Sequence, residues 1–165
     1  MPESVTDRCT KAHEYIFLLS KSPKYYFDNE AIKDDAKFPD GPNAAHAIQK
    51  GVGDPKMLTR NGLHKIGAIP KSNKRSVWTI TTKPFTEAHF ATFPKDLIEP
   101  CVLAGCPKGG TVLDPFGGSG TTGVVAVAHN RDAILCELNK DYVNIMEKRL
   151  DRELGMFHTK EILEL

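Results

Sequence analysis

The sequence predicts an α/β fold, and this prediction depends on the pattern of residues 111–150. Two short apolar runs indicate strands, a glycine-rich loop and a helix of small residues lie between them, and an amphipathic helix follows. This order of elements is half of a doubly wound parallel sheet. The length of 165 residues, with 40% hydrophobic and 26% charged residues, suits one folded domain with a real core.

The first part of the chain predicts a strand followed by loops. In residues 1–28, the near-continuous apolar run at residues 14–20 is typical of a buried strand, and residues 24–28 extend it or return from it. Residues 29–76 are rich in Gly, Pro, Asn and Lys, which indicates long loops with room for a short helix. Residues 76–80 then form a short strand or an extended segment.

The remaining region, residues 77–165, contains the clearest elements. Residues 93–104 predict a helix that has Thr92 as its cap and Pro94 in its first turn. We expect a kink at Pro100, because proline lacks an N–H and clashes with the carbonyl four residues before it.

The sheet pattern itself begins after this helix. We expect a short buried strand at residues 111–113, a loop at 117–120, a helix at 121–129 and a second strand at 133–136. Asn139 then caps a helix. Its apolar positions fall on one stripe and are Tyr142, Ile145, Met146 and Leu150.

A literal G-x-G-x-x-G motif lies at Gly118, Gly120 and Gly123, and an acidic residue, Glu137, follows the next apolar run. By motif alone this is the dinucleotide-binding fingerprint. Asp114, however, places a carboxylate at the end of the strand, where a dinucleotide would bring its pyrophosphate. Like charges about 4 Å apart cost about 4 kcal/mol at an effective dielectric of about 20.

S-adenosylmethionine reverses the sign of this interaction. It has no phosphate and carries a sulfonium and an ammonium group, so that the Asp114 carboxylate attracts it, directly or through water. Glu137 can accept hydrogen bonds from both ribose hydroxyls, which the two cofactors share. The sequence therefore favours the methyl donor over a nicotinamide cofactor.

The net charge of +1 hides a segregation of charge along the chain. Residues 55–86 contain no Asp or Glu and seven basic residues, which are Lys56, Arg60, Lys65, Lys71, Lys74, Arg75 and Lys83. Such a segment suits a polyanionic partner, because each cation set against a phosphate releases a counterion. A basic loop without a partner is the alternative.

The cysteines and the lengths of the apolar runs indicate in which cellular compartment the protein works. No run approaches the length of a membrane span, and no secretory signal is visible. The four cysteines are too sparse for a disulfide framework, which suits the cytoplasm. Cys101 and Cys106 lack a second Cys or His pair to complete a zinc site, so we predict no metal.

Three strings carry a resemblance to a known family: HFATFPKDLIEPCVLAG, GGTVLDPFGGSGTT and CELNKDY. They resemble the DNA amino-methyltransferases that modify adenine N6 or cytosine N4. The match is closest to the subgroup in which the catalytic motif precedes the cofactor motifs, and it is specific over residues 87–150. The start, PESVTDRCTKAHEYIFLLSKSPKYYFD, resembles the segment that follows the catalytic region, although Cys9 stands where the family commonly has Pro.

The resemblance implies a Rossmann-like methyltransferase sheet that is incomplete. Residues 1–28 would supply late strands, residues 29–76 would be a basic, loop-rich insert for target recognition, and residues 77–165 would be the cofactor-binding half. The implied S-adenosylmethionine site consists of His89, Phe90, Ala91, Thr92, Phe93, Pro94, Asp114, Phe116, Gly117, Gly118, Ser119, Gly120, Thr121, Thr122, Glu137 and Leu138.

The implied partner is double-stranded DNA. Its phosphates would be contacted by Arg60, Lys65, Lys71, Lys74 and Arg75. For Phe90 and Phe93, packing in the core is an equally good interpretation.

The family's catalytic tetrapeptide has Asp, Asn or Ser, then Pro-Pro, then an aromatic residue, and this sequence contains no Pro-Pro. We therefore predict no catalytic residue and no DNA methylation by this chain alone. Three interpretations stay open: a DNA methyltransferase by family, a remnant or split subunit that needs a complementary upstream segment, and, much weaker, a nicotinamide-dependent oxidoreductase. The choice between adenine and cytosine also stays open.

Overall fold

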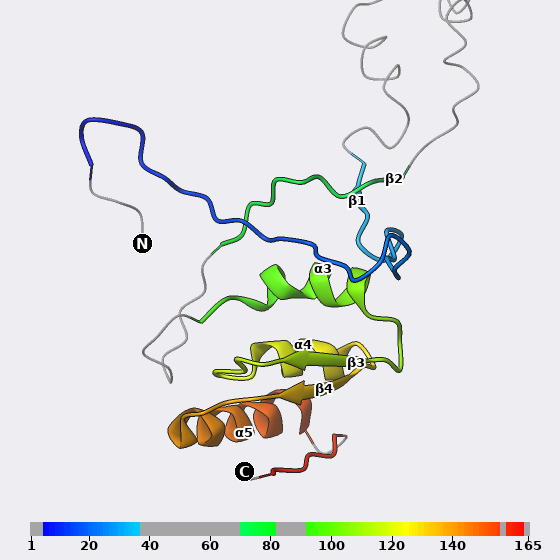
Figure 1. Cartoon of the computed structure of the whole chain (residues 1–165), viewed down its shortest axis with the longest axis vertical. Helices are drawn as coiled ribbons and strands as arrows, with labels where there is room; N and C mark the ends of the chain where they lie inside the picture. Colours follow the sequence, from blue (N-terminus) through cyan, green and yellow to red (C-terminus); the bar gives the residue numbers. More distant parts are fainter. Residues whose placement is uncertain (1–4, 37–69, 82–91, 156–157, 164–165) are drawn as a thin grey trace, which may run out of the picture.

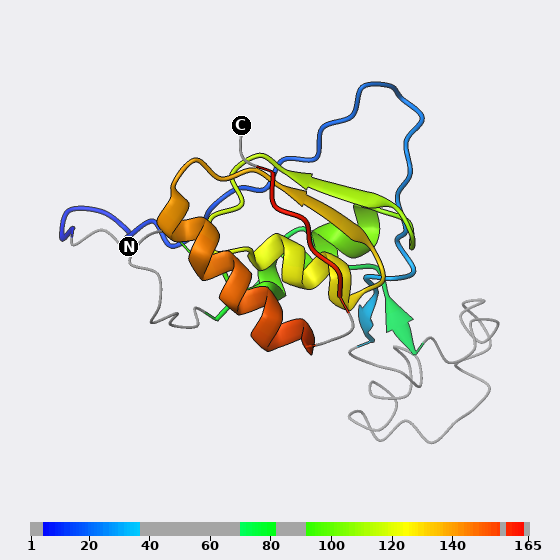
Figure 2. The same ribbon diagram turned by 90° about the horizontal axis from the view of Figure 1, so that it is seen from below.

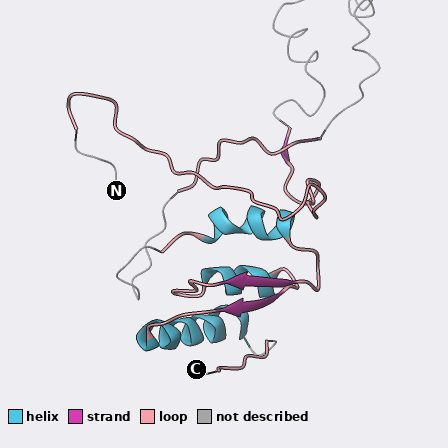
Figure 3. Cartoon of the chain, viewed as in Figure 1, coloured by secondary structure: helices cyan, strands magenta, loops and turns pink. Residues whose placement is uncertain are grey.

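The computed structural model describes residues 5–36, 70–81, 92–155 and 158–163, and most of its regular structure lies in the second half of the chain (Figure 1). That half alternates helices and strands, as the sequence predicts (Figure 3). The elements are α3 (Lys95–Gly105), β3 (Thr111–Asp114), α4 (Thr121–Ala128), β4 (Asp132–Leu135) and α5 (Lys140–Leu154).

The two strands form a parallel pair with a helix between them along the chain. β3 pairs with β4 in a register that runs from Thr111 opposite Asp132 to Asp114 opposite Leu135. α4 packs against both strands and is flanked by α3 and α5 (Figure 2). The core lies at this junction and consists of Val102, Val125 and Ala126, with Ile98, Val112 and Ala133 packed against it. The α/β class is confirmed.

The expectation that the strand at residues 111–113 is buried is wrong for one of its faces, and the second strand shows the same pattern. Alternate side chains are exposed, with Leu113 63% and Ile134 55% accessible. Within the described residues, the helices that pack on the pair contact its other face, which explains the alternation. One face of the strand pair is therefore left uncovered by the described residues.

The predicted buried strand at residues 14–20 is also wrong in this structure. No strand is assigned there or at residues 24–28, and the apolar residues 15–19 are 54–87% exposed. The segment runs in an extended path past α3, and one backbone bond from the Asp28 N–H to the Ala104 carbonyl, 2.9 Å long, anchors its end (Figure 1). An apolar run predicts burial only where another strand is present to pair with it.

The ends of the predicted insert are held together by a short antiparallel pair. β1 (Asp34–Asp35) pairs with β2 (Lys71–Ser72), and Lys74 forms an ion pair of 3.0 Å with Asp34. Residues 37–69 lie outside the described part. Residues 76–80 are described and contain no strand, which leaves the extended alternative.

The helix ends differ in how well the sequence predicts them. Asn139 caps α5 as expected, because its side chain accepts a hydrogen bond of 2.9 Å from the Asp141 N–H. The predicted cap of α3 is wrong: Pro94, not Thr92, is the N-cap residue, and it makes no side-chain hydrogen bond. α3 continues through Pro100.

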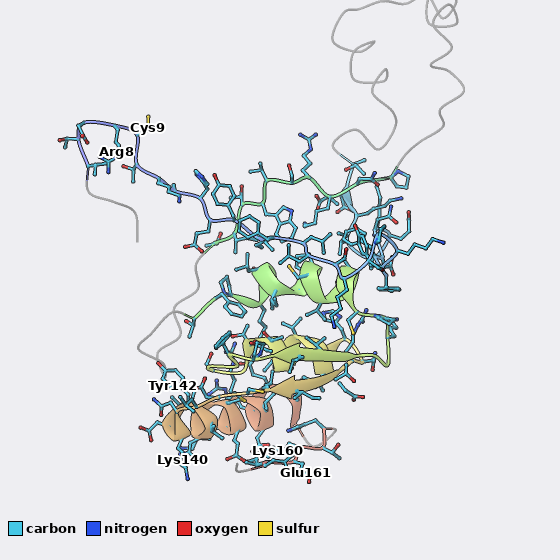
Figure 4. The ribbon with its side chains drawn as sticks, in the orientation of Figure 1. Arg8, Cys9, Lys140, Tyr142, Lys160 and Glu161 are labelled. Atoms are coloured by element: carbon cyan, nitrogen blue, oxygen red, sulfur yellow. The ribbon has the colours of Figure 1, made fainter. Side chains whose placement is uncertain are left out.

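The C-terminal residues return along α5. Lys160 forms ion pairs with Asp151 at 2.7 Å and with Glu147 at 3.4 Å, and Figure 4 shows it beside the helix. In the same view, Arg8 and Cys9 lie at the far end of the N-terminal segment, away from the helices.

Candidate cofactor-binding site

The glycine-rich loop between β3 and α4 is organised by the carboxylate of Asp114. One carboxylate oxygen accepts a hydrogen bond of 2.9 Å from the Phe116 N–H, and the other accepts one of 2.6 Å from the Thr122 hydroxyl. The carboxylate therefore lies at the carboxyl end of β3 and ties the start of the loop to the first turn of α4. Ligands of open α/β sheets bind at this end of the strands.

Glu137 approaches the same loop from the neighbouring strand. Its Oε2 accepts a hydrogen bond of 2.9 Å from the Gly118 N–H, and its Oε1 accepts one of 2.8 Å from the Asn139 N–H. Each carboxylate oxygen has a second lone pair, so Glu137 keeps acceptor capacity for a ligand. Because β3 and β4 are parallel and in register, their carboxyl ends bring Asp114 and Glu137 to one side of the loop.

Glycine is required at positions 118 and 120 of the G-x-G-x-x-G motif for different structural reasons. Gly118 has a φ of +51°, and its missing side chain would contact nothing closer than 3.8 Å. Gly120 has a φ of +77°, and a Cβ there would lie 2.6 Å from Met146 Cγ. At Gly118 the requirement for glycine is thus the left-handed backbone alone, whereas Gly120 also allows α5 to approach the loop.

Two apolar side chains near this loop are almost fully exposed to solvent. Phe116 is 86% exposed and Leu138 is 100% exposed. Phe116 follows the strand that carries Asp114, and Leu138 follows Glu137. Neither side chain is covered by the described residues.

A groove of about 520 Å³ continues from this loop between α3 and β3. Phe93 lies at its α3 end, Asp114 and Thr122 lie at its loop end, and Ile98 and Val102 contribute apolar surface. The groove therefore brings together predicted site residues from two separate stretches of the chain, residues 92–94 and 114–122. Thr92 and Pro94 adjoin Phe93 in the chain, whereas His89, Phe90 and Ala91 lie outside the described residues.

The remaining predicted loop residues take inward positions. Gly117, Ser119 and Thr121 are buried, and the Gly117 N–H donates a 2.8 Å hydrogen bond to the Cys136 carbonyl. These residues shape the loop from within.

The basic residues predicted to contact DNA are partly described. Lys71 lies in β2, and Lys74 lies 5.3 Å from the centre of the Trp78 ring in addition to its pair with Asp34. The Trp78 Nε1–H donates a 2.6 Å hydrogen bond to the Arg75 carbonyl, which fixes the backbone of this segment. Arg60 and Lys65 lie outside the described residues.

Sequence reasoning missed a buried ionic cluster behind the loop. Arg149 is 6% exposed, although it is charged, and it bonds Ser119, Thr121 and Glu153. Partial burial acts to raise the pKa of Glu153, but hydrogen bonds from Lys95 and Arg149 outweigh it and hold that pKa below its ordinary value. The helical spacing predicts only that Arg149 shares the inner face of α5 with Met146, three residues earlier, and does not predict which residues it bonds.

Two further observations concern the whole described part. The four cysteines are free thiols, and burial raises the pKa of the Cys101 thiol. None of the helices in the described ranges has both the length and the apolar content that crossing a bilayer requires.

Comparison with known proteins gives consistent matches. The N6/N4 methyltransferase family model, described as DNA methylase, matches residues 1–148. The type II methyltransferase M.SmaI of Serratia marcescens is 45% identical over 92% of this chain and 42% of its own length. M.Cfr9I of Citrobacter freundii is 43% identical over 93% of this chain and 41% of its own length. The chain thus spans less than half the length of these relatives.

A solved structure gives a shorter match. A putative DNA modification methylase from Thermus thermophilus, crystallised in complex with S-adenosyl-L-methionine, is 35% identical, with a TM-score of 0.35. The match covers 39% of this chain and 27% of the other. The fold described above does not depend on this likeness.

Proposed function

Because the chain belongs to the N6/N4 DNA methylase family, we propose that it forms the cofactor-binding part of an enzyme that methylates DNA. The donor is S-adenosylmethionine, and the acceptor is an exocyclic amine of adenine or cytosine. We place this enzyme in the cytoplasm, because its four cysteines are too sparse for a disulfide framework.

The observation that carries the cofactor assignment is the pair of carboxylates at one glycine loop. Asp114 ends β3, Glu137 follows β4, and the Gly118 N–H links the loop to Glu137. A positive charge about 6 Å from a carboxylate is stabilised by about 3 kcal/mol at an effective dielectric of about 20. The sulfonium and ammonium groups gain from this field, whereas a pyrophosphate is repelled. The same argument disfavours a nicotinamide-dependent oxidoreductase.

Asp114→Asn provides a clean test of the charge. The Asn carbonyl oxygen can still accept from the Phe116 N–H, and the Thr122 hydroxyl can turn to accept from the new NH₂ group. Shape and hydrogen bonds are therefore kept while the charge is removed. We expect the affinity for S-adenosylmethionine, measured by calorimetry, to fall about ten-fold to a hundred-fold, given the roughly 3 kcal/mol above and its screening by solvent.

The matched control is Asp132→Asn, which removes an exposed carboxylate at the opposite end of the same strand pair. Its affinity should stay at the wild-type value. Tighter binding of NAD than of S-adenosylmethionine by the wild-type chain would refute the assignment.

We further propose that catalysis requires a complementary segment that carries the Pro-Pro motif. The 165 residues contain no Pro-Pro, and correct placement of the target amine can contribute on the order of 7–11 kcal/mol to lowering the barrier. In the described part, β3 pairs only with β4, and the groove between α3 and β3 runs along its other side. The part of that groove along residues 111–113 is the proposed seat of a strand from the complementary segment, which would also cover Leu113, whereas the end at Asp114 and Thr122 is left to the methyl donor.

A mixing experiment tests this proposal. The chain is incubated with labelled methyl donor and unmethylated DNA, alone and together with a separate polypeptide segment that carries the Pro-Pro motif. Activity only in the mixture supports the proposal, whereas transfer by the chain alone would show that another part of it holds the base. No methyl transfer in either sample would favour an inactive remnant of a methyltransferase.

For DNA, we propose phosphate contacts from the basic segment. Lys74 is already engaged by Asp34 and Trp78, so Arg75 gives the sharper test. Arg75→Ala should lower the slope of log affinity against log salt by about 0.9 if one phosphate contact is lost. Lys148→Ala, an exposed lysine on α5, is the control and should leave the slope unchanged. An unchanged slope in the Arg75 variant would contradict the contact.

A further inference from the structure

Arg149 of α5 lies directly behind the glycine-rich loop. Its Nη1 donates hydrogen bonds to the Ser119 hydroxyl at 2.9 Å, to the Ser119 carbonyl at 3.3 Å and to the Thr121 hydroxyl at 2.8 Å. Ser119 and Thr121 are themselves buried, with 5% and 3% exposure. A buried guanidinium that bonds three oxygens of one short loop restricts that loop strongly, because hydrogen bonds to charged groups are the strong ones.

A second contact of Arg149 connects the loop with another element. Its Nε donates a 2.8 Å hydrogen bond to Glu153, and Glu153 also pairs with Lys95, the first residue of α3. Lys95 directly follows Phe93 and Pro94, which belong to the other predicted wall of the cofactor site. The chain of contacts therefore runs from the glycine loop through α5 to the start of α3.

On the premise of the proposed function, we propose that Arg149 is a positioning residue for the binding of the methyl donor. It holds Ser119 and Thr121 from the side opposite the ligand, so that the Gly118 backbone and the Asp114 carboxylate keep their places. Glu153, which pairs with Lys95, extends this restraint to the start of α3. It thereby sets the distance between the glycine loop and residues 93–94.

A purely structural role for a buried arginine has a matched example in this chain. Arg131 is 5% exposed and donates to the Cys106 carbonyl from Nε at 3.1 Å and from Nη2 at 2.9 Å. It also bonds the His129 carbonyl, at 2.6 Å. Arg131 precedes β4 and so lies at the amino end of the strands, away from the glycine loop.

The experiment compares Arg149→Met with Arg131→Met in the 165-residue chain. Three quantities are measured: affinity for S-adenosylmethionine by calorimetry, resistance to urea, and hydrogen exchange of the amides of residues 117–122 without ligand. We expect both variants to lose resistance to urea. Only the Arg149 variant should lose affinity, by about ten-fold to a hundred-fold, as the loss of charged hydrogen bonds implies, and only it should exchange faster in the loop.

A second variant keeps the test decisive if Arg149→Met does not fold. Arg149→Lys retains the charge but has a single nitrogen, so it cannot bond the loop oxygens and Glu153 at the same time, as Nη1 and Nε of Arg149 do. It should fold, bind the methyl donor with intermediate affinity and show intermediate loop exchange.

The outcomes separate the two proposals. Wild-type affinity in both Arg149 variants, or an equal loss of affinity in Arg131→Met, would show that Arg149 acts only on overall stability. If the wild-type chain binds no S-adenosylmethionine, the proposed function fails. In that case unchanged loop exchange in Arg149→Met overturns the positioning role as well, and accelerated exchange upholds it.

Discussion

Substituting alanine at Gly120 should destabilise the protein far more than the same change at Gly118. Both positions have a left-handed backbone, with φ of +77° and +51°, which costs a residue with a Cβ about 1–2 kcal/mol. At Gly120 the new Cβ would also lie 2.6 Å from Met146 Cγ, whereas at Gly118 the closest atom is 3.8 Å away. Overpacking of this kind costs about 1–3 kcal/mol.

The backbone cost applies at both glycines, whereas the overpacking cost applies only at Gly120, so the expected losses of stability differ. We expect Gly118→Ala to lower the free energy of unfolding by about 1–2 kcal/mol and Gly120→Ala by about 2–5 kcal/mol, with backbone and packing terms added. The assay is urea unfolding followed by circular dichroism. Met146→Ala provides a cycle, because removing the side chain removes the clash: the double variant should be more stable than additivity predicts by about 0.5–3 kcal/mol.

Equal losses at the two glycines would refute the packing argument, as would an additive double variant. The functional readout should separate them further. Gly118→Ala is expected to weaken the binding of S-adenosylmethionine beyond its effect on stability, because its backbone faces the open side of the loop.

Two further predictions concern α5 and its partners. Asn139→Ala removes the cap that accepts from the Asp141 N–H and should lower the free energy of unfolding by about 0.5–2 kcal/mol; the exposed Asn144→Ala is the control, and equal losses would count against the cap. Glu153 has a lowered pKa in the folded state, so its contribution to stability is present above the unfolded pKa, about 4.3, and is lost as the pH falls through the folded value. In Glu153→Gln, acid unfolding monitored by circular dichroism should therefore depend less on pH in that window, and an unchanged pH dependence would contradict the pairing with Lys95 and Arg149.

The order of strand, loop and helix in residues 111–154 could be predicted because its signals are local. Glycines permit the backbone of the loop, Asn139 supplies the cap of α5, and the spacing of Tyr142, Ile145, Met146 and Leu150 sets its inner face. Asp114 could be predicted from its place between the strand and the glycine motif together with its charge, and its position at the end of β3 follows from the chain order. The grouping of Asp114, Glu137 and Gly118 was predictable for the same reason.

What could not be predicted depends on parts distant in the sequence. The exposed run at residues 15–19 has the composition of a strand, but composition does not tell whether a pairing strand is at hand. Arg149 was missed because arginine is seldom fully buried without partners, and its partners Ser119 and Thr121 lie 30 and 28 residues earlier in the chain. Thr92 has the side chain of a good cap, yet Pro94 takes that position in α3.

The short pairing of β1 with β2 has a consequence for how relatives of this protein can diverge. Asp34 and Asp35 lie opposite Ser72 and Lys71, so the two ends of the intervening segment meet at a fixed point outside the βαβ core. Once such ends are joined, doubling the length of the connection costs only about 0.6 kcal/mol of closure entropy. The segment between them can therefore lengthen, shorten or be exchanged during evolution while β3, α4 and β4 stay as they are. On the proposed function, in which this basic segment contacts DNA, a change of DNA target would not require rebuilding the proposed methyl-donor site.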